Sequence, residues 1–452
     1  MTRNLSADRL QPFARIGGVL HCEEVDLREA ARAFGTPLYV YSRAGILDRW
    51  RAYEAAFAGR PHRIHYAVKA NSTLGILELL VEAGACFDVV SAGEILRVLA
   101  AGGQPERIVF SGVGKTRRDI ALALLLGVGC INAESIPELE RIERIAASLG
   151  RRAPVALRIN PNVDAHVDEH VATGVGDSKF GIDIRDAFSV CRQLPQMRAL
   201  ELKGLSVHIG SQIRSVEPYR ETVRILAPLV RQLEALGLML EHLDLGGGAG
   251  VAYRASETTL EPQNLANALY AELDRELPEL KARVDVEPGR SIVAAAGVLL
   301  TQVEFIKRGR FGRSFAIVDA SMTELLRPAL YGAYHKIEEV ETPEGPREVF
   351  DVVGSVCEST DCLGHGRSLA VKEGTLLALR TAGAYGMSMA SNYNSRPLPM
   401  EVLVSGNRMT PLRRRQTEAD LFADELLAGE ARADAGVLRA TLFKALDIAQ
   451  KI

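Results

Sequence analysis

The stretch Ile64-His65-Tyr66-Ala67-Val68-Lys69-Ala70-Asn71-Ser72 has the alternating apolar pattern of a β-strand, with a lysine where the strand should end. Burying an ammonium group is costly unless the group is paired or neutralised, and the same desolvation lowers its pKa. A lysine with a lowered pKa is suited to Schiff-base chemistry with an aldehyde. The alternative is a strand-end lysine that reaches solvent. Lys69 is therefore the first candidate for a catalytic residue.

The composition indicates a globular protein rather than a nucleic-acid or membrane binder. The chain has 452 residues, 47% of them hydrophobic, which fits two or three domains with large cores. The net charge of −3 gives no reason to expect nucleic acid or an anionic membrane as a partner. No apolar run approaches the roughly 20 residues that span a bilayer, and no signal-peptide segment is recognisable at the start. We expect a cytoplasmic protein with free cysteines.

From the opening stretch to about residue 290, apolar β-rich runs alternate with helical patterns. The candidate strands are 63–69, 87–91, 107–111, 129–133, 154–160, 203–209, 242–246 and 284–288. Eight strand–helix units fit a (β/α)8 barrel better than an open doubly wound sheet. In such barrels the chemistry collects after the carboxyl ends of the strands. The polar residues and glycines found there are Lys69, Asp88, Ser91, Ser111, Glu134, Asn160, His208, Ser211, Gly246 to Gly250 and Glu287 to Arg290.

A β-rich domain is expected to follow the barrel. After residue 292 the pattern changes to strands separated by turns, at 298–307, 315–319, 348–353, 375–381 and 401–405. The N-terminal segment has a helical pattern over Leu27–Phe34, which Gly35 is well placed to end, and then a strand over Pro37–Tyr41. The predicted division is a barrel over 43–292, a β-rich domain formed by 1–42 and 293–425, and a helical tail over 426–452.

Two motif matches are rejected. His166-Val167-Asp168-Glu169-His170 matches the zinc-protease string H-x-x-E-H, which requires both histidines on one helix, but here the flanking sequence indicates a loop. Gly246-Gly247-Gly248-Ala249-Gly250 follows a strand without completing G-x-G-x-x-G, and that strand is seventh rather than first. We therefore expect neither a metal site nor a dinucleotide site.

The same glycines suit a phosphate group. Glycine lets backbone N–H groups approach an anion, and barrel phosphate sites are commonly built from the loops after strands 7 and 8. Lys69 could bind an aldehyde, His208 could lie on an electron-poor ring, and Glu287 could keep a ring nitrogen protonated. Each feature has a structural explanation on its own. Together, at the strand ends of one barrel, they point to pyridoxal phosphate.

The sequence resembles the diaminopimelate decarboxylase family, within the alanine-racemase-like (fold-type III) group of pyridoxal-phosphate enzymes. The motifs that carry the resemblance are Tyr66-Ala67-Val68-Lys69-Ala70-Asn71, Asp88 to Glu94, Ser178 to Ile182, His208-Ile209-Gly210-Ser211-Gln212, Asp244 to Gly248, Glu287-Pro288-Gly289-Arg290, Arg327 to Tyr331, Cys357 to Asp361 and Ala384 to Pro397. The barrel motifs mark the wider group. The last three sets point to the diaminopimelate branch.

The resemblance implies a role for each matching residue. Lys69, His208 and Cys357 would be catalytic, with Cys357 placed to return a proton to the α-carbon. The cofactor would be held by Lys69, His208, Ser211, Gly248, Glu287, Pro288, Gly289, Arg290 and Tyr385. The substrate would be bound by Arg290, Arg327, Tyr331, Glu358 and Tyr385. The resemblance also implies a homodimer in which Cys357, Glu358 and Tyr385 enter the site from the second subunit.

The implied reaction is the decarboxylation of meso-2,6-diaminopimelate to L-lysine and CO2, the last step of lysine biosynthesis. Two alternatives remain at this point: a decarboxylase of another basic amino acid or polyamine precursor, and a regulatory pseudoenzyme that binds the cofactor. Arg290 and Arg327 weigh against the first, because a substrate without a distal carboxylate would leave buried guanidinium groups unpaired. Retention of both Lys69 and Cys357 weighs against the second.

Overall fold

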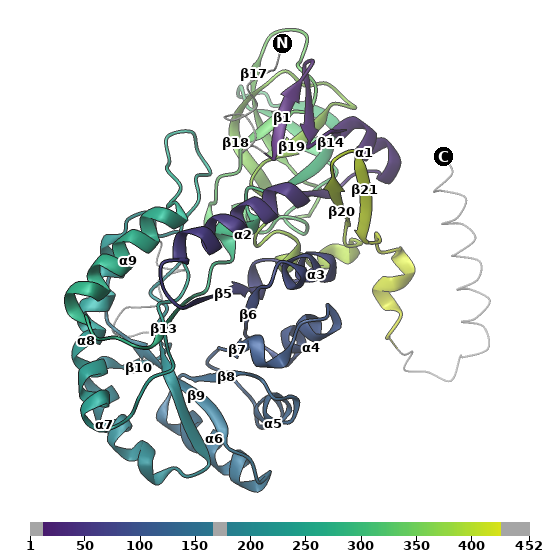
Figure 1. The fold of residues 1–452 in the computed structure, drawn as a ribbon. Helices are drawn as coiled ribbons and strands as arrows, with labels where there is room; N and C mark the ends of the chain where they lie inside the picture. The colour runs from purple at the N-terminus through teal and green to yellow at the C-terminus, as the bar shows by residue number, and fades with distance from the viewer. Residues whose placement is uncertain (1–11, 166–178, 426–452) are drawn as a thin grey trace, which may run out of the picture.

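The computed structural model describes residues 12–165 and 179–425. The predicted helical tail over 426–452 and the string His166 to His170 lie outside the described residues. Figure 1 shows two parts, a strand–helix unit formed by the middle of the chain and a β-rich unit in which the two ends of the described chain meet. No helix in the described ranges is long and apolar enough to cross a membrane.

The first part is a closed barrel of parallel strands, as predicted. Its strands, in the order in which they pair around the barrel, are β5 (His62–Ala67), β6 (Cys86–Val89), β7 (Ile108–Phe110), β8 (Cys130–Ala133), β9 (Ala153–Asn160), β11 (Leu200–Ser206), β12 (His242–Asp244) and β13 (Arg283–Val286). The pairing of β13 with β5 completes the circle. A short additional strand, β10 (Ile182–Asp183), pairs in parallel with the last two residues of β9.

Helices cover the outside of the barrel, and their ends follow local sequence rules. They are α2 (Arg43–Phe57), α3 (Leu74–Glu82), α4 (Ala92–Ala100), α5 (Arg117–Leu126), α6 (Ile136–Ser148), α7 (Ile184–Gln193), α8 (Glu217–Ala235) and α9 (Pro262–Glu276). Thr116 and Asp119 form a reciprocal capping box at the start of α5, and Gly127 ends that helix in the left-handed conformation. Such caps satisfy backbone groups that the helix itself leaves without partners.

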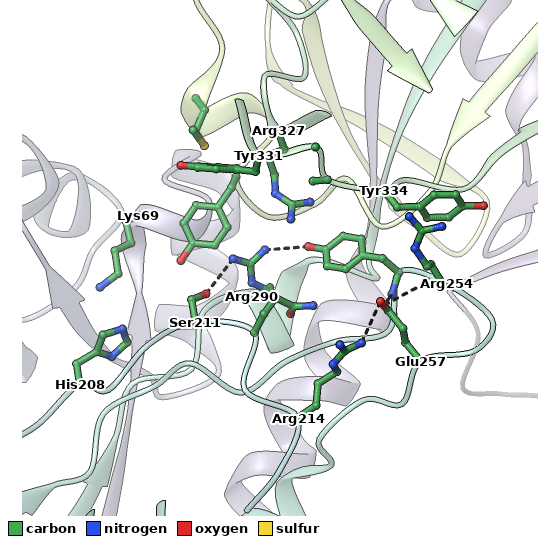
Figure 2. Close-up of a pocket in the computed structure, with 16 residues that line it drawn as sticks. Lys69, His208, Ser211, Arg214, Arg254, Glu257, Arg290, Arg327, Tyr331 and Tyr334 are labelled. Atoms are coloured by element: carbon green, nitrogen blue, oxygen red, sulfur yellow. Dashed lines mark hydrogen bonds and ion pairs between the residues drawn. The ribbon is translucent and has the colours of Figure 1, made fainter. Parts of the chain in front are cut away.

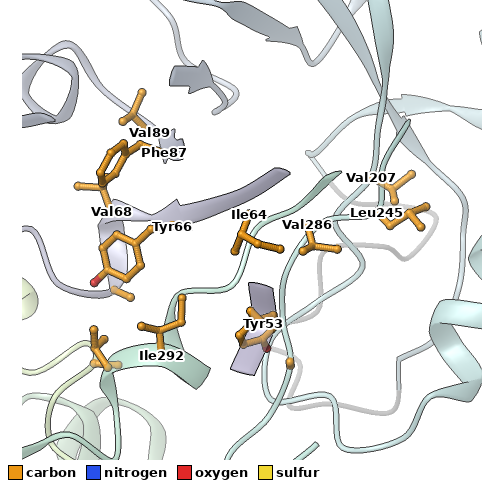
Figure 3. Close-up of a cluster of buried hydrophobic side chains, with 14 of the residues drawn as sticks. Tyr53, Ile64, Tyr66, Val68, Phe87, Val89, Val207, Leu245, Val286 and Ile292 are labelled. Carbon is orange, nitrogen blue, oxygen red and sulfur yellow. The ribbon is translucent and has the colours of Figure 1, made fainter. Parts of the chain in front are cut away.

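Large apolar side chains of the strands pack against the surrounding helices, and Figure 3 shows several of them in one buried cluster with Tyr53 of α2. Ile64, Tyr66, Phe87 and Val286 are almost completely buried, and the rings of Tyr66 and Phe87 meet edge to face at 6.5 Å. Burial of this apolar surface drives folding and holds the strand ends in fixed positions.

The second part is a β-sheet domain that the N-terminal segment completes, as predicted. The first and last thirds of the chain meet in it: β4 (Leu38–Ser42) pairs with both β14 (Gly297–Arg308) and β20 (Met400–Ser405). The other elements are α1 (Leu27–Phe34), the small sheet of β1 (Phe13–Ile16), β2 (Val19–Cys22) and β3 (Val25–Asp26), and β15 (Ser314–Val318), α11 (Arg327–Tyr331), β16 (Ile337–Glu339), β17 (Glu348–Val353), β18 (Cys362–Leu369), β19 (Leu376–Leu379) and β21 (Arg408–Arg413).

The sequence did not reveal every strand of this domain. β18 was missed because Gly364, His365, Gly366 and Arg367 interrupt the apolar alternation of a strand. Pairing with β17 holds this segment extended despite its composition.

The two parts are joined beside the opening stretch. The backbone N–H of Tyr385 donates to the carbonyl of Ala70 at 2.8 Å, and the side-chain amide of Asn71 donates to the carbonyl of Gly383 at 3.1 Å. The loop after β5 and a loop of the β-sheet domain are thereby fixed to each other, and Lys69 lies at this junction.

Candidate active site

A cavity of about 490 Å³ lies at the carboxyl end of the barrel, where the β-sheet domain covers it (Figure 2). Seven predicted residues line it: Lys69, His208, Ser211, Arg290, Arg327, Tyr331 and Tyr385. A smaller cavity of about 180 Å³ adjoins it and shares Lys69 and His208, with Glu287 in its wall. The fold thus gathers residues that are far apart in the sequence around one lysine.

Lys69 follows β5 in a 3-10 turn over Val68–Ala70. Its Nζ donates a hydrogen bond of 2.8 Å to Oδ2 of Asp88, a carboxylate that is fully buried at the end of the neighbouring strand β6. Burial would lower the pKa of Lys69, but the charge of the Asp88 carboxylate and its hydrogen bond to the ammonium group outweigh burial and raise that pKa. The lowered pKa predicted from the sequence is therefore wrong for this structure. The carboxylate of Asp88, at the end of the neighbouring strand, lies beside the lysine and keeps it charged.

His208 and Glu287 form further parts of the wall around Lys69. Burial, together with the positive charges of Lys69 and Arg158, lowers the pKa of His208 to about 3, so its ring is neutral at neutral pH. Burial, reinforced by Asp244 and Asp88, raises the pKa of Glu287 well above its ordinary value. A neutral imidazole can lie against one face of an electron-poor ring, and a buried carboxyl group can pair with a protonated ring nitrogen.

Glycines make close backbone approaches at the expected phosphate end. Gly248 has a φ of +91°, and a Cβ on it would meet the carbonyl oxygen of Gly210 at 2.2 Å. A Cβ on Gly289 would come within 2.9 Å of the Cβ of Ala67. Both positions therefore require glycine. A Cβ on Gly247 would likewise meet the carbonyl oxygen of Glu287 at 2.1 Å, so the loops after β11, β12 and β13 are packed closely together. This cradle, next to a lysine and a buried carboxyl group, fits pyridoxal phosphate.

Two buried arginines face the larger cavity. Arg290 donates to the hydroxyl of Ser211 and to the hydroxyl of Tyr253, both at 2.9 Å, and its guanidinium lies 4.6 Å from the ring of Tyr385. Arg327 lies one helical turn before Tyr331 on α11, so both side chains come from the same face of that short helix. Arg290 is 8% exposed and Arg327 is 6% exposed.

Neither arginine has a carboxylate partner within residues 12–165 and 179–425. A buried guanidinium without a counter-charge is costly unless a ligand supplies one. The cavity is therefore built to bind negatively charged groups.

Tyr385 lies in this chain's own cavity, which corrects the expectation that it enters from a second subunit. The hydrogen bond from its backbone to Ala70 ties it beside Lys69 of the same chain. Its φ of +55° is unusual for a residue that is not glycine. The sequence showed the residue type but could not show which copy of the chain supplies it.

Cys357 and Glu358 do not line either of these cavities. Cys357 is exposed, and its backbone N–H donates to Oδ1 of Asn394 at 3.2 Å. Glu358 is also exposed, and it accepts a 2.6 Å hydrogen bond from the hydroxyl of Tyr393. The fold of one chain therefore leaves these two predicted site residues on its surface.

Several residues of the site were missed by the sequence analysis. Tyr253, Arg254 and Glu257 come from the segment just after the glycine loop, and Arg214 and Tyr334 complete that side of the cavity. The search for polar residues after the strand ends stopped at Gly250, and a search a few residues further would have found Tyr253. The sequence contains no periodic pattern that would indicate the other four residues, because the packing of separate loops against each other brings them to the cavity.

Arg158 was also missed, although a signal for it was present in the sequence. It is a charged residue within the apolar strand β9, it lines the smaller cavity, and it donates to Oε1 of Glu134 at 2.6 Å. Glu134, predicted from its place after β8, thus supports the arginine in the wall of the site. Ser111 and Asn132 lie nearby, joined by a hydrogen bond of 3.0 Å.

Comparisons of the sequence and of the structure with known proteins lead to the same family of enzymes. Residues 43–294 match the family of pyridoxal-dependent decarboxylases through its pyridoxal-binding domain. A diaminopimelate decarboxylase of Pseudomonas aeruginosa is 48% identical over 92% of this chain and 99% of its own length. The structure of diaminopimelate decarboxylase from Helicobacter pylori in complex with L-lysine is 40% identical, with a TM-score of 0.84 over 88% of this chain and 98% of that one. The corresponding structure from M. jannaschii, also with L-lysine, is 35% identical, with a TM-score of 0.87 over 92% and 98%.

Proposed function

The chain belongs to the diaminopimelate decarboxylases, and we propose how its own residues divide the work of that reaction. The enzyme is a carboxy-lyase that uses pyridoxal phosphate to convert meso-2,6-diaminopimelate into L-lysine and CO2. When bound, the cofactor supplies an electron sink for the electron pair left on the α-carbon as CO2 departs.

The cofactor would be held by the residues around Lys69. Lys69 would bind the aldehyde carbon, His208 would lie against the ring, and Glu287 would keep the ring nitrogen protonated. The phosphate would lie among Ser211, Gly248, Pro288, Gly289, Arg290 and Tyr385. The close backbone approaches at Gly248 and Gly289, and the burial of Glu287 in the wall of the smaller cavity beside Lys69, support this assignment.

Arg290, Arg327, Tyr331 and Tyr385 would bind the end of the substrate that does not react. A meso substrate has one D and one L centre, and an L-lysine product keeps the L centre, so the carboxylate of the L centre is the distal one. The observation that carries this proposal is the burial of two guanidinium groups that have no carboxylate partner among the described residues. A carboxylate can receive paired hydrogen bonds from a guanidinium group, whereas a distal amine would leave both charges unpaired.

Cys357 and Glu358 would complete the site from a second copy of the chain. The reaction requires an acid that returns a proton to the α-carbon, and the Cys357 thiol is proposed for that step. Glu358 would meet the distal ammonium group. Their exposure and their absence from the cavity of their own chain support a homodimer with shared sites.

We also infer the organisation of the chain from the fold. The barrel would form one domain over 43–292, and 1–42 with 293–425 would form the second, followed by the tail over 426–452. The packing of β4 between β14 and β20 supports the assignment of the N-terminal segment to the second domain. A biosynthetic role of this kind suits a cytoplasmic enzyme.

The proposal is tested by CO2 release with pyridoxal phosphate present. The substrates are meso-2,6-diaminopimelate and D-lysine, which has the same reacting centre but lacks the distal carboxylate, with L-ornithine as a further comparison. We expect rapid release from diaminopimelate and little from the other two. Comparable turnover of D-lysine would contradict the role of the two arginines, and no turnover of diaminopimelate would contradict the catalytic assignment as a whole.

A further inference from the structure

We propose that His335, together with Tyr253, is a positioning residue that holds Arg327 ready for the distal carboxylate and so sets substrate selectivity. The inference rests on the proposed function of Arg327. Neither His335 nor Tyr253 carries charge to the substrate. Each acts through the arginines that do.

His335 is fully buried and makes two hydrogen bonds that together define its tautomer. Its Nδ1 lies 2.9 Å from the carbonyl oxygen of Arg380, and its Nε2 lies 2.7 Å from Nη1 of Arg327. A carbonyl oxygen can only accept, so Nδ1 must carry the hydrogen; a guanidinium can only donate, so Nε2 must offer a lone pair. One neutral tautomer satisfies both partners.

The carbonyl group of Arg380, which fixes the His335 ring, belongs to the backbone at the end of a β-strand. His335 comes just before β16, and Arg380 just after β19, and the two strands pair antiparallel. The backbone N–H of Arg380 also donates to the carbonyl of Lys336 at 2.8 Å. The position of Nε2 is therefore set by the backbone of two paired strands rather than by a mobile loop.

The surroundings of His335 keep it neutral. Burial, with the positive charge of Arg327 as the next cause, lowers the pKa of His335 to about 3. Arg290 and Arg367 act in the same direction, and the carbonyl of Arg380 opposes them. The ring is consequently a permanent acceptor for Arg327 at neutral pH, and it holds the guanidinium without neutralising its charge.

Tyr253 links this arrangement to the second arginine. The guanidinium of Arg327 lies 4.6 Å from the centre of the Tyr253 ring, and the His335 ring is centred 5.2 Å from the same ring, with the two ring planes 77° apart. The hydroxyl of Tyr253 accepts from Nη1 of Arg290 at 2.9 Å. A barrel residue thus fixes Arg290 by its hydroxyl and Arg327 by its ring face, so the two charges are held at a set separation.

Two substitutions of His335 separate positioning from folding. His335→Asn places an amide near the position of Nδ1, keeps a donor for Arg380 and loses the acceptor for Arg327. His335→Gln reaches the position of Nε2 and keeps an acceptor for Arg327. We expect His335→Asn to raise KM for diaminopimelate by about tenfold or more, the usual effect of losing a hydrogen bond to a charged group, with a smaller change in kcat. His335→Gln should restore most of the affinity.

Inhibition by two diamines gives a second readout. L-lysine keeps the carboxylate of the distal centre, whereas 1,5-diaminopentane lacks it. In the His335→Asn enzyme the inhibition constant of L-lysine should rise in proportion to KM, while that of 1,5-diaminopentane should stay unchanged.

The outcomes distinguish this inference from the proposed function. A wild-type enzyme with no activity on diaminopimelate would contradict the proposed function. An active wild type together with unchanged KM and L-lysine inhibition in folded His335→Asn, or equal losses for both inhibitors, would overturn the role of His335. If His335→Asn does not fold, Tyr253→Leu against Tyr253→Phe makes the same test, since only the leucine variant removes the ring that Arg327 faces. Equal L-lysine inhibition in those two variants would also overturn the proposal.

Discussion

The ammonium group of Lys69 lies 2.8 Å from the buried carboxylate of Asp88 and is held in its charged form by it. An amine must lose its proton before it can attack the cofactor aldehyde, so we expect Asp88 to set the pH at which the apoenzyme takes up pyridoxal phosphate. Asp88→Asn should lower the pKa of Lys69 and move the pH profile of reconstitution toward lower pH. Absorbance of the bound cofactor after mixing measures this, and superimposable profiles would contradict the role of Asp88.

Removal of Arg327 should weaken substrate binding. Arg327→Ala is expected to raise KM for diaminopimelate by about 10- to 100-fold, because a buried carboxylate loses a charge-assisted pair worth about 1.5–3 kcal/mol. Arg308→Ala serves as a matched control, since Arg308 is an exposed arginine of β14 paired with Glu348 on the surface. Steady-state kinetics of both variants make the comparison, and an unchanged KM in Arg327→Ala would place the distal carboxylate elsewhere.

His335 should make stability depend on pH in a defined window. Its pKa is lowered from 6.5 to about 3 in the fold, so between these values the unfolded chain binds one more proton than the native protein. The contribution of His335 is thus complete above pH 6.5 and decreases as the pH falls toward 3, by up to about 1.4 kcal/mol per pH unit. Urea unfolding from about pH 7 to about pH 5 should show a shallower decline for His335→Gln than for the wild type. Parallel declines would argue against a buried neutral histidine.

The barrel could be predicted because each of its units is local in sequence. Strands such as β5 and β6 are short apolar runs that turn residues and helices separate, and the count of these units indicates closure. The strands of the β-sheet domain were harder to predict. The sequence of β18 lacks the apolar alternation of a strand, and pairing with β17 holds it extended. Its pairing is decided by tertiary contacts that a single sequence does not display.

The site was predictable where chemistry follows a strand directly. Lys69, His208 and Glu287 were found in that way, and the structure brings all three to adjoining cavities. Tyr253 and His335 were not found because their significance lies in contacts with Arg327, which is distant from Tyr253 in the sequence. The pKa of Lys69 was predicted wrongly because the prediction considered only the burial of this residue. The charge that outweighs burial belongs to Asp88, which lies on another strand.

Mixing two inactive variants tests whether Cys357 acts across a subunit boundary. Lys69→Ala and Cys357→Ala each lack one part of the site, and a heterodimer would contain one site with both defects and one with neither. Random exchange makes half of the dimers heterodimers, so about a quarter of wild-type activity should return. Differently tagged chains and mild denaturant before mixing establish that exchange has occurred. Confirmed heterodimers without activity would place both residues in one subunit's site or deny Cys357 a catalytic role.

We assign Lys69 as the residue that bonds the cofactor, and chemical reduction of the holoenzyme checks this assignment. Borohydride treatment of the holoenzyme should fix the cofactor permanently to the protein, and peptide mapping should find the pyridoxyl group on the peptide that contains Lys69. Lys69→Ala should lose both the label and turnover while keeping its fold, which circular dichroism can verify. A pyridoxyl group found on any other lysine of the native enzyme would contradict the account.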